Sequence, residues 1–102
     1  MREILELSKL GFIPERYIEG YRVDEVNEEK RIIIEFNGDY WHCNPDRYSA
    51  DFVVWSGKTP YTAAERWERD RQRKAKLESA GYRVIDVWES DTFEEMSDKI
   101  IF

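Results

Sequence analysis

Two neighbouring segments of the chain are rich in apolar residues that favour strands, and a polar stretch separates them, so that the pattern predicts a β-hairpin. Residues 20–26 read GYRVDEV, residues 31–37 read RIIIEFN, and the charged stretch NEEK lies between them. Val, Ile, Tyr and Phe are typical of strands, and a short polar connection between two strands is typical of a hairpin. We therefore expect the two segments to pair antiparallel.

A longer, helical periodicity covers residues 61–80. Thr62 and Glu65 have the spacing of a capping box, and Gly81 follows the last periodic residue. These features are the start and stop signals of a helix. Residues 82–89, YRVIDVWE, then have the composition of a strand that returns to the sheet.

Shorter elements are predicted at both ends of the chain and in the middle. Ile4, Leu7 and Leu10 predict a helix over residues 2–10, and Phe93, Met96 and Ile100 predict a helix over residues 91–102 with these three side chains inward. The apolar run 52–55 fits either an edge strand or a lid.

The resulting order, α-β-β-α-β-α, predicts an α/β fold with a mixed central sheet flanked by helices. A chain of 102 residues is long enough for one hydrophobic core and too short for two. We therefore expect residues 1–102 to form a single domain, excised from a longer protein.

Composition excludes several classes of protein. Aromatic residues at 15% and hydrophobic residues at 41% exclude a disordered chain. Cys43 is the only cysteine, so an internal disulfide is excluded. No apolar run reaches the roughly 20 residues needed to span a bilayer. We expect a cytoplasmic protein without membrane contact.

The charge of the chain is unevenly distributed. The net charge is −6, yet residues 66–76 hold six Lys or Arg and two acids, a local charge of +4 that leaves −10 on the remainder. Such a basic strip can contact phosphates, although the acidic remainder opposes tight binding of a polyanion.

One carboxylate interrupts the apolar strand of the hairpin. Glu35 shares a face with Ile33, and the turn brings Asp24 across from it. Glu35 is an ordinary surface acid if the strand end emerges into solvent. Otherwise the two carboxylates repel one another unless a divalent cation lies between them.

Two further residues carry possible chemistry. At about 100° per residue, Asp70 lies on the apolar side of the long helix with Ala63 and Leu77. His42, the only histidine, follows the second strand of the hairpin. One explanation for Asp70 is an internal ion pair, and one explanation for His42 is a structural role. Together, however, a carboxylate and an imidazole make a general base.

These residues occur in motifs that resemble a known group of nucleases. The segments RVDEV, IIIEFNGDYWH and WERDRQRKAKLESAGYRVIDVWES are similar to those of the very-short-patch repair endonucleases and the related EDxHD homing endonucleases. Both belong to the PD-(D/E)xK nuclease superfamily. The resemblance covers about residues 20–90, and its most specific parts are WH at 41–42, ERDR at 68–71 and GYRVIDVWE at 81–89.

The resemblance implies a Vsr-like PD-(D/E)xK nuclease fold and assigns roles to individual residues. Asp24 matches the aspartate that holds the catalytic metal, His42 matches the general base, and Asp70 matches the acid paired with an active-site histidine. An N-terminal glutamate is also implied, for which Glu3 fits best and Glu6 is the other candidate.

Glu35 corresponds to the acid of the (D/E)xK motif, but Asn37 stands where that motif has lysine. Water activation is then left to the metal and His42. We expect Mg²⁺, for which Mn²⁺ can substitute, bound by Asp24 and Glu35. The cysteines and histidines that bind structural zinc in the repair enzymes are missing here, so we expect no zinc. A homing-type nuclease is favoured over a repair enzyme.

The resemblance also implies double-stranded DNA as the partner. Basic residues of the long helix are expected to contact its phosphates: Arg66, Arg69, Arg71, Arg73 and Lys74. The full-length protein is expected to be a bacterial or phage homodimer with a separate DNA-binding region. Two alternatives stay open, a non-catalytic nucleic-acid-binding module and a nuclease that cuts RNA.

Overall fold

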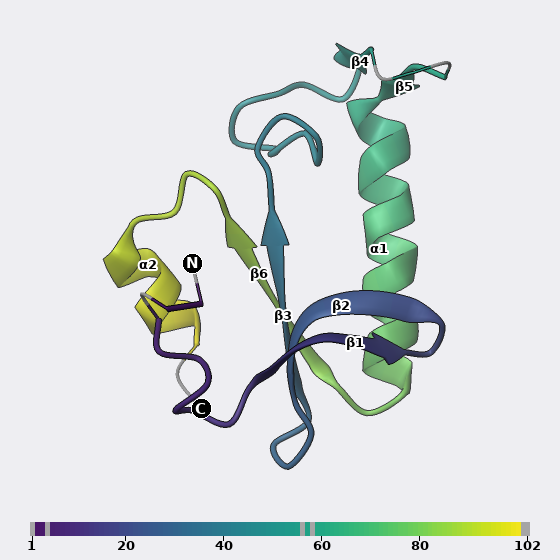
Figure 1. Cartoon of the computed structure of the whole chain (residues 1–102). Coiled ribbons are helices and arrows are strands. Elements are labelled where there is room, and N and C mark those ends of the chain that lie inside the picture. The colour runs from purple at the N-terminus through teal and green to yellow at the C-terminus, as the bar shows by residue number, and fades with distance from the viewer. Residues whose placement is uncertain (1, 4, 56, 58, 101–102) are drawn as a thin grey trace.

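The computed structural model describes residues 2–3, 5–55, 57 and 59–100. Its main sheet has the strand order β1-β2-β3-β6, and its elements have the following bounds: β1 Ile13–Ile18, β2 Tyr21–Asn27, β3 Ile32–Asn37, β4 Val53–Val54, β5 Tyr61–Thr62, α1 Ala63–Ser79, β6 Arg83–Trp88 and α2 Phe93–Lys99. The predicted α/β fold with a mixed, helix-flanked sheet is confirmed (Figure 1).

The predicted hairpin forms the centre of this sheet. β2 pairs antiparallel with β3, and the register aligns Glu25 with Ile34 and Val26 with Ile33. β3 pairs parallel with β6, which aligns Glu35 with Asp86. Parallel neighbours require a crossover, and α1 provides it between β3 and β6.

The two helices lie on opposite sides of the sheet (Figure 1). On the α1 side, Ile33 and Val84 pack with the fully buried Leu77. On the α2 side, Ile34 and Val87 pack with Met96. The alternation along each strand therefore sends its even and odd positions to two different cores.

The N-terminal segment differs from the prediction. Residues 5–11 form hydrogen-bonded turns instead of a helix over 2–10, and Ile4 lies outside the described residues. Glu6 has a positive φ of 52°, which interrupts helical geometry, and Leu7 alone is fully buried while Leu10 is 42% exposed. The segment packs against α2 through Leu5 and Leu7.

β1 is an element that the sequence pattern did not predict. Five of its six residues are exposed, and it is held by its pairing with β2. A strand at the edge of a sheet that buries neither face has no hydrophobic alternation to detect.

The remaining elements agree with the prediction except in detail. α1 and α2 both begin with a capping box, at Thr62 and Thr92. In α2, Met96 and the cap residue Ile100 are buried as predicted, but Phe93 is exposed because it begins the helix on its outer side. The predicted end of this helix at 101–102 lies outside the described residues.

The short strands β4 and β5 pair with each other beside the start of α1. Val54 of β4 is fully buried with Cys43 and Ala63. Within the run 52–55, Val53–Val54 is therefore a strand. Within the described ranges, no helix combines the length and the apolar character that crossing a bilayer requires.

Candidate active site

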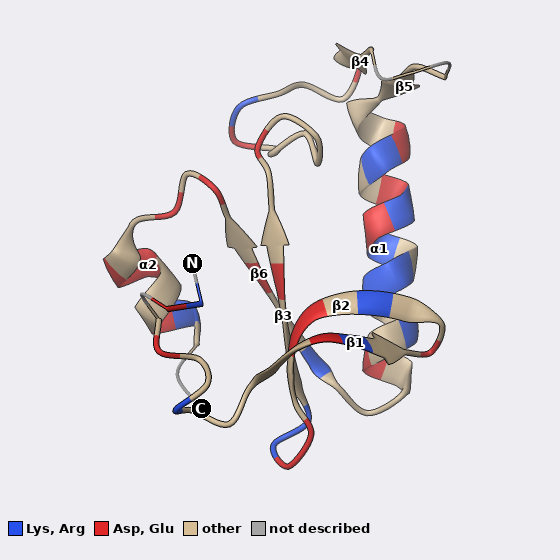
Figure 2. Cartoon of the chain, viewed as in Figure 1, with Lys and Arg blue, Asp and Glu red and all other residues tan. Residues whose placement is uncertain are grey.

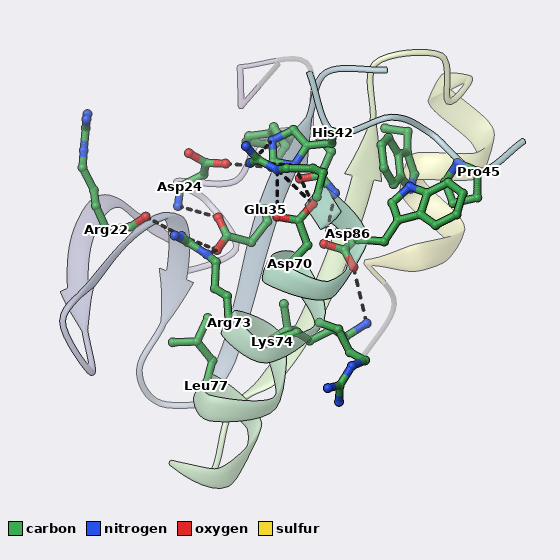
Figure 3. Close-up of a pocket in the computed structure, with 17 residues that line it drawn as sticks. Arg22, Asp24, Glu35, His42, Pro45, Asp70, Arg73, Lys74, Leu77 and Asp86 are labelled. Atoms are coloured by element: carbon green, nitrogen blue, oxygen red, sulfur yellow. Dashed lines mark hydrogen bonds and ion pairs between the residues drawn. The ribbon is translucent and has the colours of Figure 1, made fainter. Parts of the chain in front are cut away.

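A pocket of about 510 Å³ opens between α1 and the sheet. Four carboxylates line it, each from a different element: Asp24 from β2, Glu35 from β3, Asp70 from α1 and Asp86 from β6. His42, from the loop after β3, lines the same pocket (Figure 3). The structure thus brings together four of the five predicted catalytic residues.

Asp24 and Glu35 meet across the hairpin. The ladder of β2 and β3 ends at the pair Glu25–Ile34, and just beyond it backbone amides of the two strands donate to the side chains of Asp24 and Glu35. The amide of Phe36 donates to Asp24 Oδ2 at 2.7 Å, and the amide of Asp24 donates to Glu35 Oε2 at 3.4 Å. Both carboxylates are therefore held in place by the neighbouring backbone.

Glu35 also accepts hydrogen bonds from α1. Arg73 donates to Glu35 Oε1 through Nη2 at 2.7 Å and through Nε at 3.0 Å. Burial raises the pKa of the Glu35 carboxyl above its usual range, and the hydrogen bonds and charge of Arg73 offset only part of that rise. Glu35 is thus a buried acid with a cation already beside it.

His42 and Asp70 form a second pair of interacting side chains in the same pocket. His42 Nδ1 lies 3.0 Å from Asp70 Oδ2, and the two side chains are 24% and 33% exposed. An ionised carboxylate can only accept, so a hydrogen bond between the two requires the ring proton on Nδ1 and leaves the lone pair on Nε2. Nε2 is the nitrogen available to act as a base.

Arg66 contacts both members of this pair. Its Nε donates to both oxygens of Asp70, at 3.1 and 3.3 Å, and its Nη2 lies 3.1 Å from His42 Nδ1 and 3.4 Å from His42 Nε2. Burial by itself raises the pKa of the Asp70 carboxyl, but the hydrogen bond from His42 and the charge of Arg66 outweigh it and lower that pKa. Asp70 therefore stays ionised and fixes the imidazole.

The backbone around His42 is anchored by the start of α1. The hydroxyl of Tyr61 donates to the carbonyl of Trp41 at 2.8 Å, and the indole of Trp67 donates to the carbonyl of Cys43 at 2.6 Å. The carbonyls on either side of His42 are therefore both held from this end of the helix, which leaves the histidine little freedom to move.

Asp86 is a pocket residue that the sequence analysis missed. Asn37 donates to Asp86 Oδ1 at 3.2 Å, and Lys74 Nζ lies 3.4 Å from Asp86 Oδ2. The signal was available, because Asp86 interrupts the apolar strand RVIDVW just as Glu35 interrupts RIIIEFN. The parallel pairing of β3 and β6 then sets the two acids side by side.

The five basic residues predicted to bind DNA divide into two groups. Arg66, Arg73 and Lys74 turn inward, and each forms an ion pair with a pocket carboxylate. Arg71 pairs with Glu68, and Arg69 is exposed without an ion pair to any described residue. Figure 2 shows the resulting bands of basic and acidic residues along α1.

Glu3 is not among the residues that line the pocket. It belongs to the N-terminal segment, which lies on the α2 side of the sheet, whereas the pocket opens on the α1 side (Figure 1). Glu6, the other candidate, is likewise absent from the lining and pairs with Lys9 at 3.2 Å.

The donor chemistry of the pocket fits a hard divalent cation. Asp24 and Glu35 supply carboxylate oxygens from neighbouring strands, and Mg²⁺ is commonly held by one or two carboxylates together with water and substrate phosphates. Among the described residues, no group of three or more His, Cys, Asp or Glu side chains is arranged to hold a metal ion. A cation here would therefore depend on substrate and water for its other ligands.

Comparison with known proteins places this fold beside nucleases. Over 95% of the chain, the structure is similar to the catalytic domain of the homing endonuclease I-Bth0305I, with a TM-score of 0.53, 24% identity and 74% of that domain covered. This likeness shows the fold. In sequence, 71% of the chain is 29% identical over 80 residues to the type II nicking enzyme V.NaeI of Lentzea aerocolonigenes.

No protein-family model matches the sequence. The chain spans 43% of the length of the nicking enzyme, so the comparison concerns one part of that protein.

Proposed function

We propose that this chain is the catalytic domain of a metal-dependent DNA endonuclease that hydrolyses phosphodiester bonds with His42 as its general base. One observation carries the proposal: the His42–Asp70 pair lies in the same pocket as Asp24 and Glu35. The likeness of the fold to a homing endonuclease domain and of the sequence to a nicking enzyme supports DNA as the substrate.

In the proposed reaction, His42 Nε2 takes a proton from the water that attacks phosphorus. The bond from water oxygen to phosphorus forms as the bond to the leaving oxygen breaks, and the leaving oxygen then takes up a proton from solvent water. Asp70 keeps its hydrogen bond to Nδ1 and stabilises the imidazolium that forms. Arg66 has to withdraw from Nε2 when the substrate enters, because it lies 3.4 Å from that nitrogen.

Asp24 and Glu35 are the residues proposed to hold Mg²⁺ or Mn²⁺. When bound, the cation would neutralise charge on the phosphate oxygens. The backbone bonds to Asp24 and Glu35 keep their carboxylates close together before any cation arrives. Arg73 has to release part of Glu35 to make room, because it holds Oε1 twice.

The partner of the pocket is proposed to be double-stranded DNA. Arg69, at the exposed side of α1, is placed to contact phosphates beside the pocket, and Arg66, Arg71, Arg73 and Lys74 line the pocket itself. Such contacts position the duplex but do not read its sequence. In the longer protein, sequence specificity and the assembly of two copies would come from other segments.

The test is to incubate supercoiled plasmid with the parent chain, Asp24→Asn and His42→Ala, each in Mg²⁺ and in EDTA. We expect nicking by the parent in Mg²⁺ only, no nicking by Asp24→Asn, and a rate for His42→Ala lower by roughly 10²-fold or more, the usual contribution of a general base. An RNA of similar length is treated in parallel.

The outcomes separate the three readings of the chain. Cleavage of RNA but not plasmid would move the activity to a ribonuclease. Binding of either polymer without cleavage at high protein concentration would show a binding module, for which the ion pairs in the pocket are purely structural. Undiminished nicking by His42→Ala would remove the histidine from the mechanism.

A further inference from the structure

The three inward cations of α1 are held with different strength. Arg73 donates twice to Glu35 and also to the carbonyl of Arg22 at 2.6 Å. Arg66 donates to both oxygens of Asp70. Charge-assisted bonds in pairs are the strong kind, so both guanidinium groups are firmly committed to their carboxylates.

Lys74 is held more weakly than either arginine. Among the described residues, its single polar contact is with Asp86 Oδ2 at 3.4 Å, and the two side chains are 42% and 35% exposed. An ion pair of this exposure contributes little to stability, because water screens both charges. Lys74 is therefore the inward cation that a new anion can take over at least cost.

Asp86 remains in place when Lys74 leaves it. Asn37 donates to its other carboxylate oxygen at 3.2 Å, and the register of β3 and β6 sets it directly beside Glu35. The departing ammonium therefore moves within the pocket that Asp24, Glu35 and His42 line. This arrangement supplies a mobile positive charge close to the proposed reaction centre.

We propose that Lys74 binds the phosphate that is to be cleaved, and that Asp86 holds Lys74 in the pocket until the phosphate arrives. The inference rests on the proposed function and adds a substrate contact to it. A lysine ammonium is a compact charge with three donors on a flexible stem, which suits it to follow a phosphate oxygen. Asp86 acts as a positioning residue through Lys74.

The test measures binding without cleavage. A fluorescent duplex of about 20 base pairs is titrated with protein in EDTA at low salt, where phosphate contacts are strongest. We expect Lys74→Gln to weaken binding by about fivefold, the equivalent of about 1 kcal/mol. Lys76→Gln is the matched control, because Lys76 lies on the same helix but does not line the pocket.

The second variant, Asp86→Asn, should change the affinity for the duplex in the opposite direction. Asp86→Asn releases Lys74 and should tighten binding of the duplex, whereas a merely structural Asp86 would leave it unchanged or weaker. Glu78→Gln, an exposed acid-to-amide change on α1, controls for the change in net charge. The gain from Asp86→Asn should vanish when Lys74→Gln is also present, and the gain from Glu78→Gln should persist.

Two results would overturn the inference. Either Lys74→Gln binds the duplex as tightly as Lys76→Gln, or the gain from Asp86→Asn survives the loss of Lys74. Both results leave the endonuclease proposal standing, because they concern affinity in EDTA. Absence of plasmid nicking in Mg²⁺ by a parent chain that shows the expected affinities would overturn the endonuclease and leave Lys74 as a phosphate contact.

Discussion

At the scale of single residues, the chemistry of the pocket depends on pairs of charges. His42 obtains its tautomer from Asp70, and Asp70 obtains its low pKa from His42 and Arg66 against the effect of burial. Glu35 shows the opposite balance, because burial raises its pKa in spite of Arg73. Two carboxyl groups in one pocket are thus pushed in opposite directions, as is common where acids have different roles.

The shift of Asp70 predicts how stability depends on pH. A carboxyl whose folded-state pKa is lowered stabilises the fold above its unfolded-state pKa of about 4, and this stabilisation is lost as the pH falls through the lower folded-state pKa. The difference in unfolding free energy between the parent and Asp70→Asn should therefore shrink as the pH falls below about 4.

Urea denaturation of both proteins across this range measures the difference. Glu35 titrates with the opposite sign, because its raised pKa makes its stabilising contribution disappear as the pH rises, but it is present in both proteins and cancels. A difference that stays the same from neutral pH to well below 4 would show that Asp70 titrates normally.

The sequence located those site residues whose positions depend on local geometry. A hairpin register brings Asp24 to Glu35, and helical periodicity turns Asp70 inward; both follow from short stretches of chain. Asp86 depends on the parallel pairing of β3 with β6, which joins segments far apart in sequence. The sequence did not predict that Arg66, Arg73 and Lys74 turn inward, because charged side chains are normally expected at the solvent-exposed surface.

At the scale of elements, α1 carries much of the site, so its first turn has a measurable role. In its capping box, the Thr62 hydroxyl accepts from the Glu65 amide at 3.2 Å, and α2 has the same arrangement at Thr92. Thr62→Ala should lower the unfolding free energy by about 1 kcal/mol, as loss of an N-cap commonly does. Thr92→Ala should cost a similar amount.

Of the two substitutions, only Thr62→Ala should alter the geometry of the pocket. Tyr61 and Trp67, which hold the backbone of His42, stand beside that cap, whereas α2 lies on the other side of the sheet. We expect slower plasmid nicking by Thr62→Ala and an unchanged rate for Thr92→Ala, both below their melting temperatures. Equal rates in the two variants would mean that the cap serves stability alone.

The elements that the sequence predicted well are those with their own stop signals and buried faces. The hairpin, α1 and β6 all combine periodicity with a clear boundary, and all are present within two residues of the prediction. The prediction of an N-terminal helix was wrong. The spacing of Leu7 and Leu10 is typical of one face of a helix, but Leu10 is exposed. β1 was missed because pairing, and not burial, stabilises it.

At the scale of the whole molecule, the chain is acidic, and most basic residues of the pocket are paired with carboxylates in the same pocket. The chain has a net charge of −6, and Arg66, Arg73 and Lys74 each face a carboxylate. Long-range attraction for DNA, the proposed partner, is therefore weak, and the proposed binding has to come from the few cations that reach phosphates directly.

This balance predicts a shallow dependence of DNA affinity on salt. Each neutralised phosphate contributes about 0.9 to the slope of log affinity against log salt concentration, so contacts by Lys74, Arg69 and Arg71 imply a slope no steeper than about −3. Titration of a labelled duplex in EDTA at several KCl concentrations measures the slope, and Lys74→Gln should reduce it by about one unit. A slope near −6 or steeper would require a wider basic surface than α1 presents, and the pocket would then no longer account for the binding.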